Sequence, residues 1–252
     1  MGKKRSSYRA RSILYGVHAV VETLRAGRRV VEEVYLARPI REGSELDHQL
    51  VRSEPPISHV NESDMRSLAG TAHHQGVAAR VGPFPYDTLD SILSRERNGS
   101  QVLVLLDSVQ DPTNVGSILR SAECLGAIGV VIAKDRAAGI TPAVEKASAG
   151  ASAHMGVARV VNLVRAIDQI KQESFWVYGA DASASDTCYQ VDLRGNVAFV
   201  LGSEESGLRR LVRESCDCCV RIPMEGRIDS LNVAQTTAIL LAESLRQRKH
   251  AL

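Results

Sequence analysis

Several features that define common protein classes are scarce or missing in this sequence. Aromatic residues make up only 4% of its 252 residues, which leaves little side-chain surface for stacking against planar ligands. No segment approaches the roughly 20 consecutive apolar residues that a membrane-spanning helix needs, and the basic start MGKKRSSYRARS leads into no apolar signal core. We therefore expect a cytoplasmic protein with no membrane partner.

Two common kinds of ligand site also lack their sequence signals. The CDCC cluster at 216–219 has no second pair of ligands at zinc spacing, and the adjacent His73 and His74 are equally weak evidence for a metal. We expect reduced thiols and no metal site. The GxGxxG pattern of a dinucleotide-binding loop is missing at the positions where the strands end, which disfavours a nicotinamide-dependent dehydrogenase.

The rest of the composition is that of a globular protein, with 44% hydrophobic and 24% charged residues. A chain of 252 residues is long enough for two domains. The net charge of +2 excludes neither a nucleic acid nor an acidic metabolite as partner, because binding depends on local clusters of charge. The one obvious basic cluster lies in residues 1–12, which we expect to form a disordered tail that either solubilises the chain or engages phosphates.

Residues 13–82 predict a small α/β domain, because helical and strand periodicities alternate along them. The expected helices are Val17–Ala26, Ser44–Arg52 and a segment from Asn61 to Gly70, and the expected strands are Glu33–Ala37, Ile57–Val60 and Val77–Val81. Gly82, Pro83 and Pro85 then predict a linker over 83–98, so that a second domain covers 99–252.

The second domain opens with a predicted strand, helix and strand. Val102–Leu106 and Ile128–Ala133 are unbroken apolar runs, typical of parallel strands that are buried on both faces. Between them, Pro112 favours the first turn of a helix, with Asp111 and Asn114 as candidate caps. Arg120 falls nearly opposite the apolar stripe of this helix, which by itself suggests a solvated side chain.

The remaining pattern continues the alternation and predicts a parallel α/β sheet. Further elements are expected as strands at Val157–Val161, Phe175–Tyr178, Val197–Leu201 and Cys218–Ile222, and as helices beginning at Pro142, over Leu163–Gln172, and from Ser230 or Asn232 to the end.

Three loops that follow predicted strands are rich in Gly, Asn, Ser and acidic residues. They cover 107–120, 201–207 and 222–232. Because the carboxyl ends of parallel strands lie at one edge of a sheet, these loops are expected to build one polar pocket.

In this order, and ending in SLN before a final helix, the loops resemble the SpoU/TrmH family of the SPOUT RNA methyltransferases, most closely the bacterial enzymes that methylate a guanosine 2′-hydroxyl of 23S ribosomal RNA. The second loop, GSEESG, matches that family's G-x-E-x-x-G pattern. The YGVHAVVETLRAG start and HQGVAARV end of the first domain are similar to the family's substrate-binding domain, which is L30e/L7Ae-like.

The resemblance implies several properties. The catalytic domain is expected to combine a parallel sheet with a deep trefoil knot, against the general rule that chains do not thread loops. S-adenosylmethionine is the expected methyl donor, without a metal. Ribosomal RNA is the expected partner. The family works as a homodimer with its active site at the dimer interface, which gives Arg120 a reason to lie away from its own core stripe.

The same resemblance assigns site residues. The family's polar active-site positions are occupied by Asn114, Arg120, Glu204, Ser230 and Asn232. The positions that hold the methyl donor are occupied by Leu201, Gly202, Ser203, Ile222, Leu231 and Asn232.

A sulfonium methyl group is already electrophilic, so the enzyme must chiefly align a ribose oxygen with it and weaken that oxygen's hold on its proton. Arginine is a poor general base because it normally keeps its proton. We therefore expect Arg120 to grip the neighbouring phosphate and stabilise the developing alkoxide, with Asn114 orienting it. Glu204 is either the proton acceptor or a positioning group.

Because aromatic residues are few, we expect Arg, Lys and amide side chains of the first domain to contact the RNA, among them Arg80, His74 and Gln75. A solvated loop is the alternative for His74 and Gln75. Two other functions stay open: a transfer-RNA ribose 2′-O-methyltransferase, and a non-catalytic RNA-binding or ribosome-assembly protein on the same fold.

Overall fold

The computed structural model describes residues 12–95, 99–135 and 137–249. These residues divide into two compact units, which are described separately. One unit runs to Pro85 and takes in Ala149–His154, a segment that includes a short 3₁₀ helix, Ala151–Ala153. The other consists of Tyr86–Ser148 and Met155–Leu252. The predicted tail lies outside the described residues except for Ser12, which begins the first strand.

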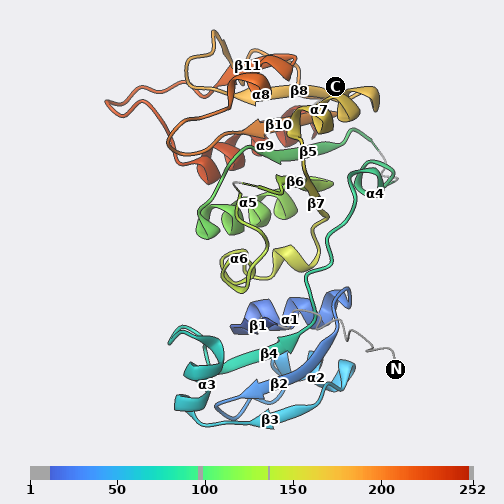
Figure 1. Ribbon diagram of the computed structural model, residues 1–252, viewed down its shortest axis with the longest axis vertical. Helices are drawn as coiled ribbons and strands as arrows, with labels where there is room; N and C mark the ends of the chain where they lie inside the picture. The colour runs from blue at the N-terminus through green and yellow to red at the C-terminus, as the bar shows by residue number, and fades with distance from the viewer. Residues whose placement is uncertain (1–11, 96–98, 136, 250–252) are drawn as a thin grey trace, which may run out of the picture. The chain divides into compact units, whose positions relative to one another are not determined.

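The N-terminal unit is a mixed four-stranded sheet in the order β1-β4-β2-β3. Its strands are β1 (Ser12–Tyr15), β2 (Val31–Leu36), β3 (Ile57–His59) and β4 (Val77–Val81), and its helices are α1 (Val17–Ala26), α2 (Glu45–Ser53) and α3 (Glu62–Ala69). Apolar residues of α1 and α2 pack on one face of the sheet, and Met65 of α3 packs on the other face (Figure 1). The unit is therefore a sheet covered by helices on both sides.

Local signals in the sequence set most of these boundaries. The side chains of Ser44 and Asn61 accept hydrogen bonds from the backbone N–H groups of Asp47 and Asp64, which caps α2 and α3 as predicted. Gly27 ends α1 in the left-handed conformation that glycine adopts without strain. Strand β1 was not predicted, because its four residues become a strand only through antiparallel pairing with β4.

The C-terminal unit is a seven-stranded sheet in the order β7-β6-β5-β10-β8-β11-β9, and every pair of neighbouring strands is parallel. Its strands are β5 (Val102–Leu106), β6 (Gly129–Ala133), β7 (Val157–Val160), β8 (Trp176–Ala180), β9 (Asp186–Thr187), β10 (Val197–Leu201) and β11 (Cys218–Arg221). Its helices are α4 (Leu89–Leu93), α5 (Pro112–Cys124), α6 (Pro142–Ala147), α7 (Leu163–Gln172), α8 (Arg210–Ser215) and α9 (Val233–Lys249). The predicted parallel sheet is thus confirmed.

Helices cover both faces of this sheet (Figure 1). Residues of α4, α7 and α8 share one apolar core with alternate residues of the strands, such as Leu103 and Leu105 of β5. On the other face, α5 packs against α6 and α9, and α9 also contacts β10. Strand β10 lies between β5 and β8, where the strand order changes direction. In open parallel sheets, loops at the carboxyl ends of the strands flanking such a point form the ligand site.

One predicted helix cap needed correction, and two elements of this unit were missed. Asp111 caps α5 by accepting from the backbone N–H of Thr113, whereas the side chain of Asn114 is used elsewhere. Helix α8 and strand β9 were not predicted. Both are short, with six and two residues, and β9 exists only as an edge strand beside β11.

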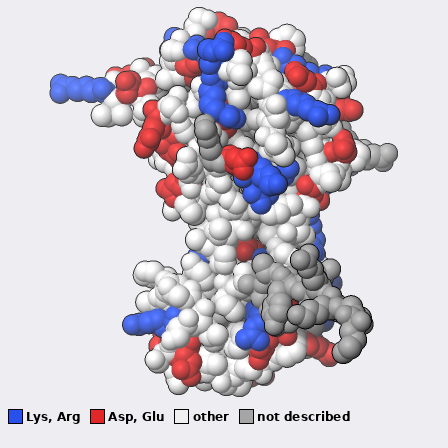
Figure 2. All heavy atoms as spheres, viewed as in Figure 1, with Lys and Arg blue, Asp and Glu red and all other residues white. Residues whose placement is uncertain are grey.

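Charges of both signs are mixed on the surface, in keeping with the net charge of +2: Lys and Arg alternate with Asp and Glu over the face in view in Figure 2. Among the helices that the structure describes, none has the length and apolar character required to cross a membrane.

Candidate functional site

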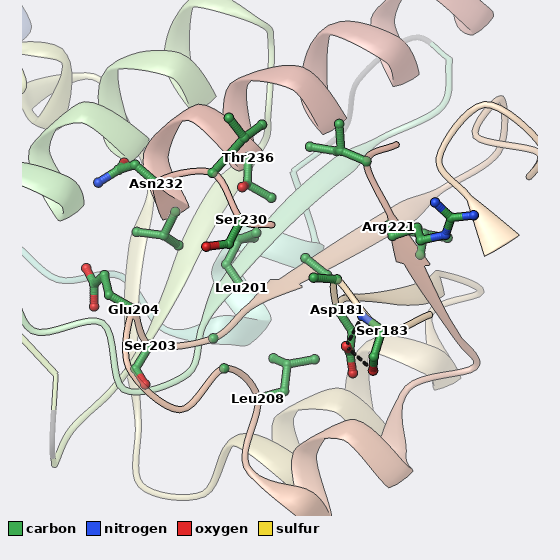
Figure 3. Close-up of a pocket in the computed structure, with 18 of the residues that line it drawn as sticks. Asp181, Ser183, Leu201, Ser203, Glu204, Leu208, Arg221, Ser230, Asn232 and Thr236 are labelled. Carbon is green, nitrogen blue, oxygen red and sulfur yellow. Dashed lines mark hydrogen bonds between the residues drawn. The ribbon is translucent and has the colours of Figure 1, made fainter. Parts of the chain in front are cut away.

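A cavity of about 630 Å³ opens at the carboxyl ends of β8, β10 and β11 (Figure 3). This volume is in the range of small-molecule sites in proteins. Eight of the predicted site residues line it: Leu201, Gly202, Ser203, Glu204, Ile222, Ser230, Leu231 and Asn232. The structure therefore brings the second and third polar loops together on one cavity.

The first loop joins them through hydrogen bonds. The Nδ2 of Asn114 donates to Oε1 of Glu204, and Nδ2 of Asn232 donates to Oδ1 of Asn114 at 2.9 Å. These contacts connect residues 90 and 118 positions apart in the chain. Asn114 is only 9% exposed and does not line the cavity itself, so it acts as a bridge between the two residues that do.

The direction of this chain of hydrogen bonds is fixed at one end. Oδ1 of Asn232 accepts from the backbone N–H of Ala234 at 2.8 Å, in the first turn of α9. A backbone N–H can only donate, so the oxygen of the Asn232 amide must face it and the nitrogen must face Asn114. The same logic turns the Asn114 nitrogen toward Glu204. The arrangement, which we call the amide relay, requires an acceptor at Glu204.

The 202–207 loop is a tight hairpin. The backbone groups of Ser203 and Gly207 exchange hydrogen bonds of 3.1 and 3.0 Å across its base. A Cβ atom on Gly202 would lie 2.1 Å from the carbonyl carbon of Gly207, so the two limbs touch with no room for a side chain. Glycine at this position therefore allows the close approach that gives the loop its shape.

Asp181 and Ser183 lie at the end of the cavity away from Glu204 and Asn232 (Figure 3). Burial favours the neutral form of Asp181, but hydrogen bonds from the hydroxyl and backbone N–H of Ser183, together with the charge of Arg213, outweigh it and lower the pKa of Asp181. The Nε of Arg213 is 2.9 Å from Oδ2 of Asp181. This end of the cavity thus holds an ion pair in which Asp181 is ionised and Arg213 is its counter-charge.

Sequence reasoning did not predict Asp181, Ser183, Arg213 or the further lining residue Thr236 as site residues. Asp181 directly follows β8, so the rule that placed the other loops at strand ends would have found it. Arg213 lies in the unpredicted helix α8, and no sequence signal marked it.

Arg120 does not line the cavity. It is an exposed residue of α5, and its guanidinium makes no hydrogen bond or ion pair with any residue that the structure describes. The alkoxide role predicted for it, with Asn114 as its orienting group, is not visible within one chain, because the Asn114 side chain is bound to Glu204 and Asn232.

The residues predicted to bind RNA have different surroundings in the N-terminal unit. His74 is 1% exposed, and its Nδ1 accepts from the backbone N–H of Gly76. The ring is thus packed inside the unit, so the predicted contact with RNA would require this loop to open. The Oε1 of Gln75 accepts from the backbone N–H of Val17, at the start of α1.

Arg80 is partly exposed and held in place. Its Nη1 lies 3.0 Å from Oε2 of Glu33, and its guanidinium stacks over the ring of Tyr35 at 5.3 Å. The carboxylate of Glu33 also accepts from the hydroxyl of Ser58. Arg80 thus presents a preset cation rather than a mobile one.

The cavity suits a small ligand that has both apolar and polar parts. Leu201, Ile222 and Leu231 supply an apolar wall, and carboxylates stand at its two ends. The five cysteines are free thiols. Over residues 12–95, 99–135 and 137–249, no group of three or more His, Cys, Asp or Glu side chains is placed to hold a metal ion.

Comparison with known protein families gives two matches. The model of the SpoU rRNA Methylase family matches residues 101–242. The model described as RNA 2′-O ribose methyltransferase substrate binding matches residues 13–87.

Individual relatives extend over nearly the whole chain. The 23S rRNA (guanosine-2′-O-)-methyltransferase RlmB of Xanthomonas axonopodis is 39% identical over 93% of this chain and 96% of its own. An uncharacterized tRNA/rRNA methyltransferase of Synechocystis is 38% identical over 95% of this chain, which spans 63% of that longer relative. The crystal structure of the SpoU methyltransferase AviRb from Streptomyces viridochromogenes in complex with AdoMet is 26% identical, with a TM-score of 0.81 over 99% of this chain and 95% of that one.

Proposed function

Since the chain belongs to the SpoU rRNA Methylase family, we propose that it transfers a methyl group from S-adenosylmethionine to the 2′-hydroxyl of a guanosine in 23S ribosomal RNA. The observation that carries this proposal is the meeting of three loops through Asn114, Glu204 and Asn232 beside one cavity. The relatives named RlmB give the substrate, and the AdoMet complex of AviRb supports the methyl donor.

The cavity has the parts that such a donor needs. When bound, S-adenosylmethionine supplies an electrophilic sulfonium methyl group. Leu201, Ile222 and Leu231 would hold its apolar portion, and the Glu204 carboxylate would complement its positive charge. Gly202 keeps the loop limbs close enough to form the wall.

We propose Glu204 as the acceptor of the ribose hydroxyl proton. The amide relay holds one oxygen of its carboxylate by a hydrogen bond from Asn114, which leaves the other oxygen for the substrate. Asn232 fixes Asn114 in turn. Ser230, which also lines the cavity, is an additional hydroxyl for orienting the ribose or the donor.

Arg120 is assigned to a neighbouring subunit's pocket. Its exposed guanidinium has no partner among the described residues of its own chain, and arginine is suited to gripping an RNA phosphate while stabilising a developing alkoxide. We therefore propose a homodimer in which each subunit lends Arg120 to the other's site.

The dimer proposal is tested by mixing two inactive variants, Arg120→Ala and Glu204→Gln. In a shared site, the mixed dimer has one pocket with both native residues, so co-expression should restore about a quarter of the native activity. Complete lack of recovery in dimers that are shown by mass to be mixed would place Arg120 in its own subunit's pocket.

The proposal has further parts that follow the family. The segment from β11 to α9 is proposed to close a deep trefoil knot, supported by the packing of α9 against α5 and β10 near the centre of the sheet. The N-terminal unit is proposed to be L30e/L7Ae-like and to bind the RNA through preset cations such as Arg80. With a ribosomal RNA substrate, the protein is proposed to act in the cytoplasm, and the methyl transfer is proposed to proceed without a metal.

The decisive experiment incubates purified protein with radiolabelled S-adenosylmethionine and with unmodified 23S ribosomal RNA made by transcription. Label in an alkali-resistant dinucleotide would locate the methyl group on a ribose 2′-hydroxyl, and sequencing of that dinucleotide would test for guanosine. Transfer-RNA transcripts serve as the parallel substrate.

Each outcome decides between the alternatives. Label confined to transfer RNA would replace the proposed substrate. Binding of S-adenosylhomocysteine and RNA without any methylation would favour a non-catalytic RNA-binding or assembly protein.

A further inference from the structure

Asp107 is a fully buried carboxylate outside the cavity. It follows β5, and its side chain is 0% exposed. Such a group is expensive to bury unless hydrogen bonds and a counter-charge compensate it. Arg209, 102 residues later, supplies both: its backbone N–H donates to Oδ2 at 2.8 Å and its Nε donates to Oδ1 at 2.6 Å.

The two contacts fix the chain at a particular place. Arg209 stands two residues after Gly207, where the chain leaves the 202–207 loop. Asp107 also donates its own backbone N–H to the carbonyl of Leu201, which is the residue just before the loop. One residue of the first polar loop therefore holds both limbs of the second polar loop.

The position of these limbs determines the position of functional groups. Gly202 and Gly207 are in contact with no space for a Cβ, so a shift of the returning limb must move Gly202 or open the hairpin. The Ser203–Gly207 backbone pair transmits the same shift toward Glu204. A displacement of about 1 Å in a catalytic group is enough to lower a rate about 100-fold.

We propose that Asp107 and Arg209 are a positioning pair that sets the place of the 202–207 loop, and through it of Gly202 and Glu204. The inference rests on the proposed methyl transfer for its kinetic consequence but not for its structural one. Neither residue lines the cavity, so neither is a catalytic residue.

The opposite ends of the strands provide a control, Asp217, that is matched in its partners, although its side chain is 22% exposed. Asp217 precedes β11, accepts from the backbone N–H of Val177 at 2.8 Å and pairs with Nζ of Lys171 at 2.8 Å. It thus has the same kinds of partner as Asp107, one backbone N–H and one cation. It holds β8 and β11 together at their amino ends, away from the cavity.

The test compares Asp107→Asn with Asp217→Asn in the full-length protein. Each amide would keep an acceptor but lose the charge and one accepting oxygen. Both variants should unfold at a lower temperature than the native protein. Only Asp107→Asn should lower turnover, by about 100-fold. It should also weaken the affinity for S-adenosylhomocysteine about tenfold.

Arg209 offers a second route if Asp107→Asn does not fold. Its side chain is 45% exposed, so its replacement leaves no closed cavity, although Arg209→Ala should lower the melting temperature because Asp107 loses its counter-charge. Arg209→Ala should lower turnover, and Arg209→Lys should recover part of the loss because the lysine ammonium can still donate to Asp107. Equal turnover in the alanine and lysine variants would overturn the positioning role.

Amide hydrogen exchange separates this inference from the proposed function. In Asp107→Asn, exchange in residues 202–209 should accelerate relative to Asp217→Asn, whether or not the native protein methylates RNA. The inference would be overturned if Asp107→Asn and Asp217→Asn showed equal exchange in this segment. It would also be overturned if both variants lost the same affinity for S-adenosylhomocysteine. A native protein that fails to methylate RNA but shows the predicted exchange would refute only the proposed function.

Discussion

The seven-stranded sheet has loops at the amino ends of its strands and loops at their carboxyl ends. The two sets of loops use the same types of hydrogen bond for different purposes. At the amino edge, Oδ1 of Asn196 accepts from the backbone N–H of Gln101, and this amide makes no onward bond with any described residue. At the carboxyl edge, Asn232 also accepts from a backbone N–H but passes a hydrogen bond on to Asn114. The difference separates bonds that complete a fold from bonds that orient a site.

The largest expected effect compares two glycines at opposite ends of β10. Gly202→Ala places a Cβ against Gly207 and should shift the loop, costing about 1–3 kcal/mol of unfolding free energy. Because the cavity wall moves with it, the affinity for S-adenosylhomocysteine should fall at least about 100-fold, measured by calorimetry.

Gly195 is the control for this substitution. A Cβ there meets no atom within 4 Å, so Gly195→Ala should leave ligand affinity unchanged and should raise stability by roughly 0.4–1 kcal/mol through the unfolded chain. If both alanine variants bound S-adenosylhomocysteine like the native protein, the 202–207 loop would not form the donor site.

A second comparison reverses the polarity of the amide relay. Asn232→Asp keeps the acceptor for the N–H of Ala234, since aspartate caps helices as well as asparagine does. The second oxygen of the introduced carboxylate would face Oδ1 of Asn114. The amide of Asn114 must then turn, which presents its Oδ1 to Glu204. Turnover should fall about 100-fold with little change in melting temperature.

Asn196→Asp is the matched change at the amino edge and should keep full turnover, because an introduced carboxylate still accepts from Gln101. The double variant Asn232→Asp with Glu204→Gln reverses the whole relay, so it should again satisfy both hydrogen bonds of the Asn114 side chain. Its turnover should stay low for lack of a carboxylate. Native turnover in Asn232→Asp would show that the direction of the relay has no function.

The smallest expected effect compares two aspartates. Asp181→Asn removes the ion pair with Arg213 and should cost about 1 kcal/mol of unfolding free energy at pH 7. Because the folded state lowers the pKa of Asp181, its contribution is present above the ordinary aspartate range and is lost as pH falls through it. The difference from the native protein should therefore shrink below about pH 4, measured by urea unfolding.

Asp192 lies between β9 and β10, and hydrogen bonds from the side chain and backbone N–H of Arg194 lower its pKa to about 2. Its side chain is 60% exposed, so solvent screens the pair and Asp192→Asn should change stability by less than about 0.5 kcal/mol. A larger loss in Asp192→Asn than in Asp181→Asn would contradict the expectation that the less exposed ion pair of Asp181 contributes more to stability.

Periodicity and capping made much of the fold predictable. The spans Val17–Ala26, Val77–Val81, Leu163–Gln172 and Val197–Leu201 agree residue for residue with their predictions. These segments carry complete local signals: an apolar pattern together with a cap, a glycine or a turn at the end. Strand β9 and helix α8 were missed because two and six residues are too few to show a period.

The site residues divide in a similar way. Glu204 and Asn232 follow strands in polar loops, so their placement at one edge could be argued from the sequence. The bridging role of Asn114 could not be argued from the sequence, because its local position favoured a helix cap. Only its contacts with residues distant in the chain show that it is a bridge. The burial of His74 was equally hidden, since a polar residue in a loop is exposed by default.

The sequence by itself determined the alternation of helices and strands, the parallel sheet and the three polar loops, because these depend on residues close together in the chain. Only the tertiary structure decided which atoms meet: the relay of Asn114, Glu204 and Asn232, and the hold of Asp107 on Arg209. Contacts between residues about 100 positions apart leave no local pattern, since they arise when the order of the strands places two loops side by side.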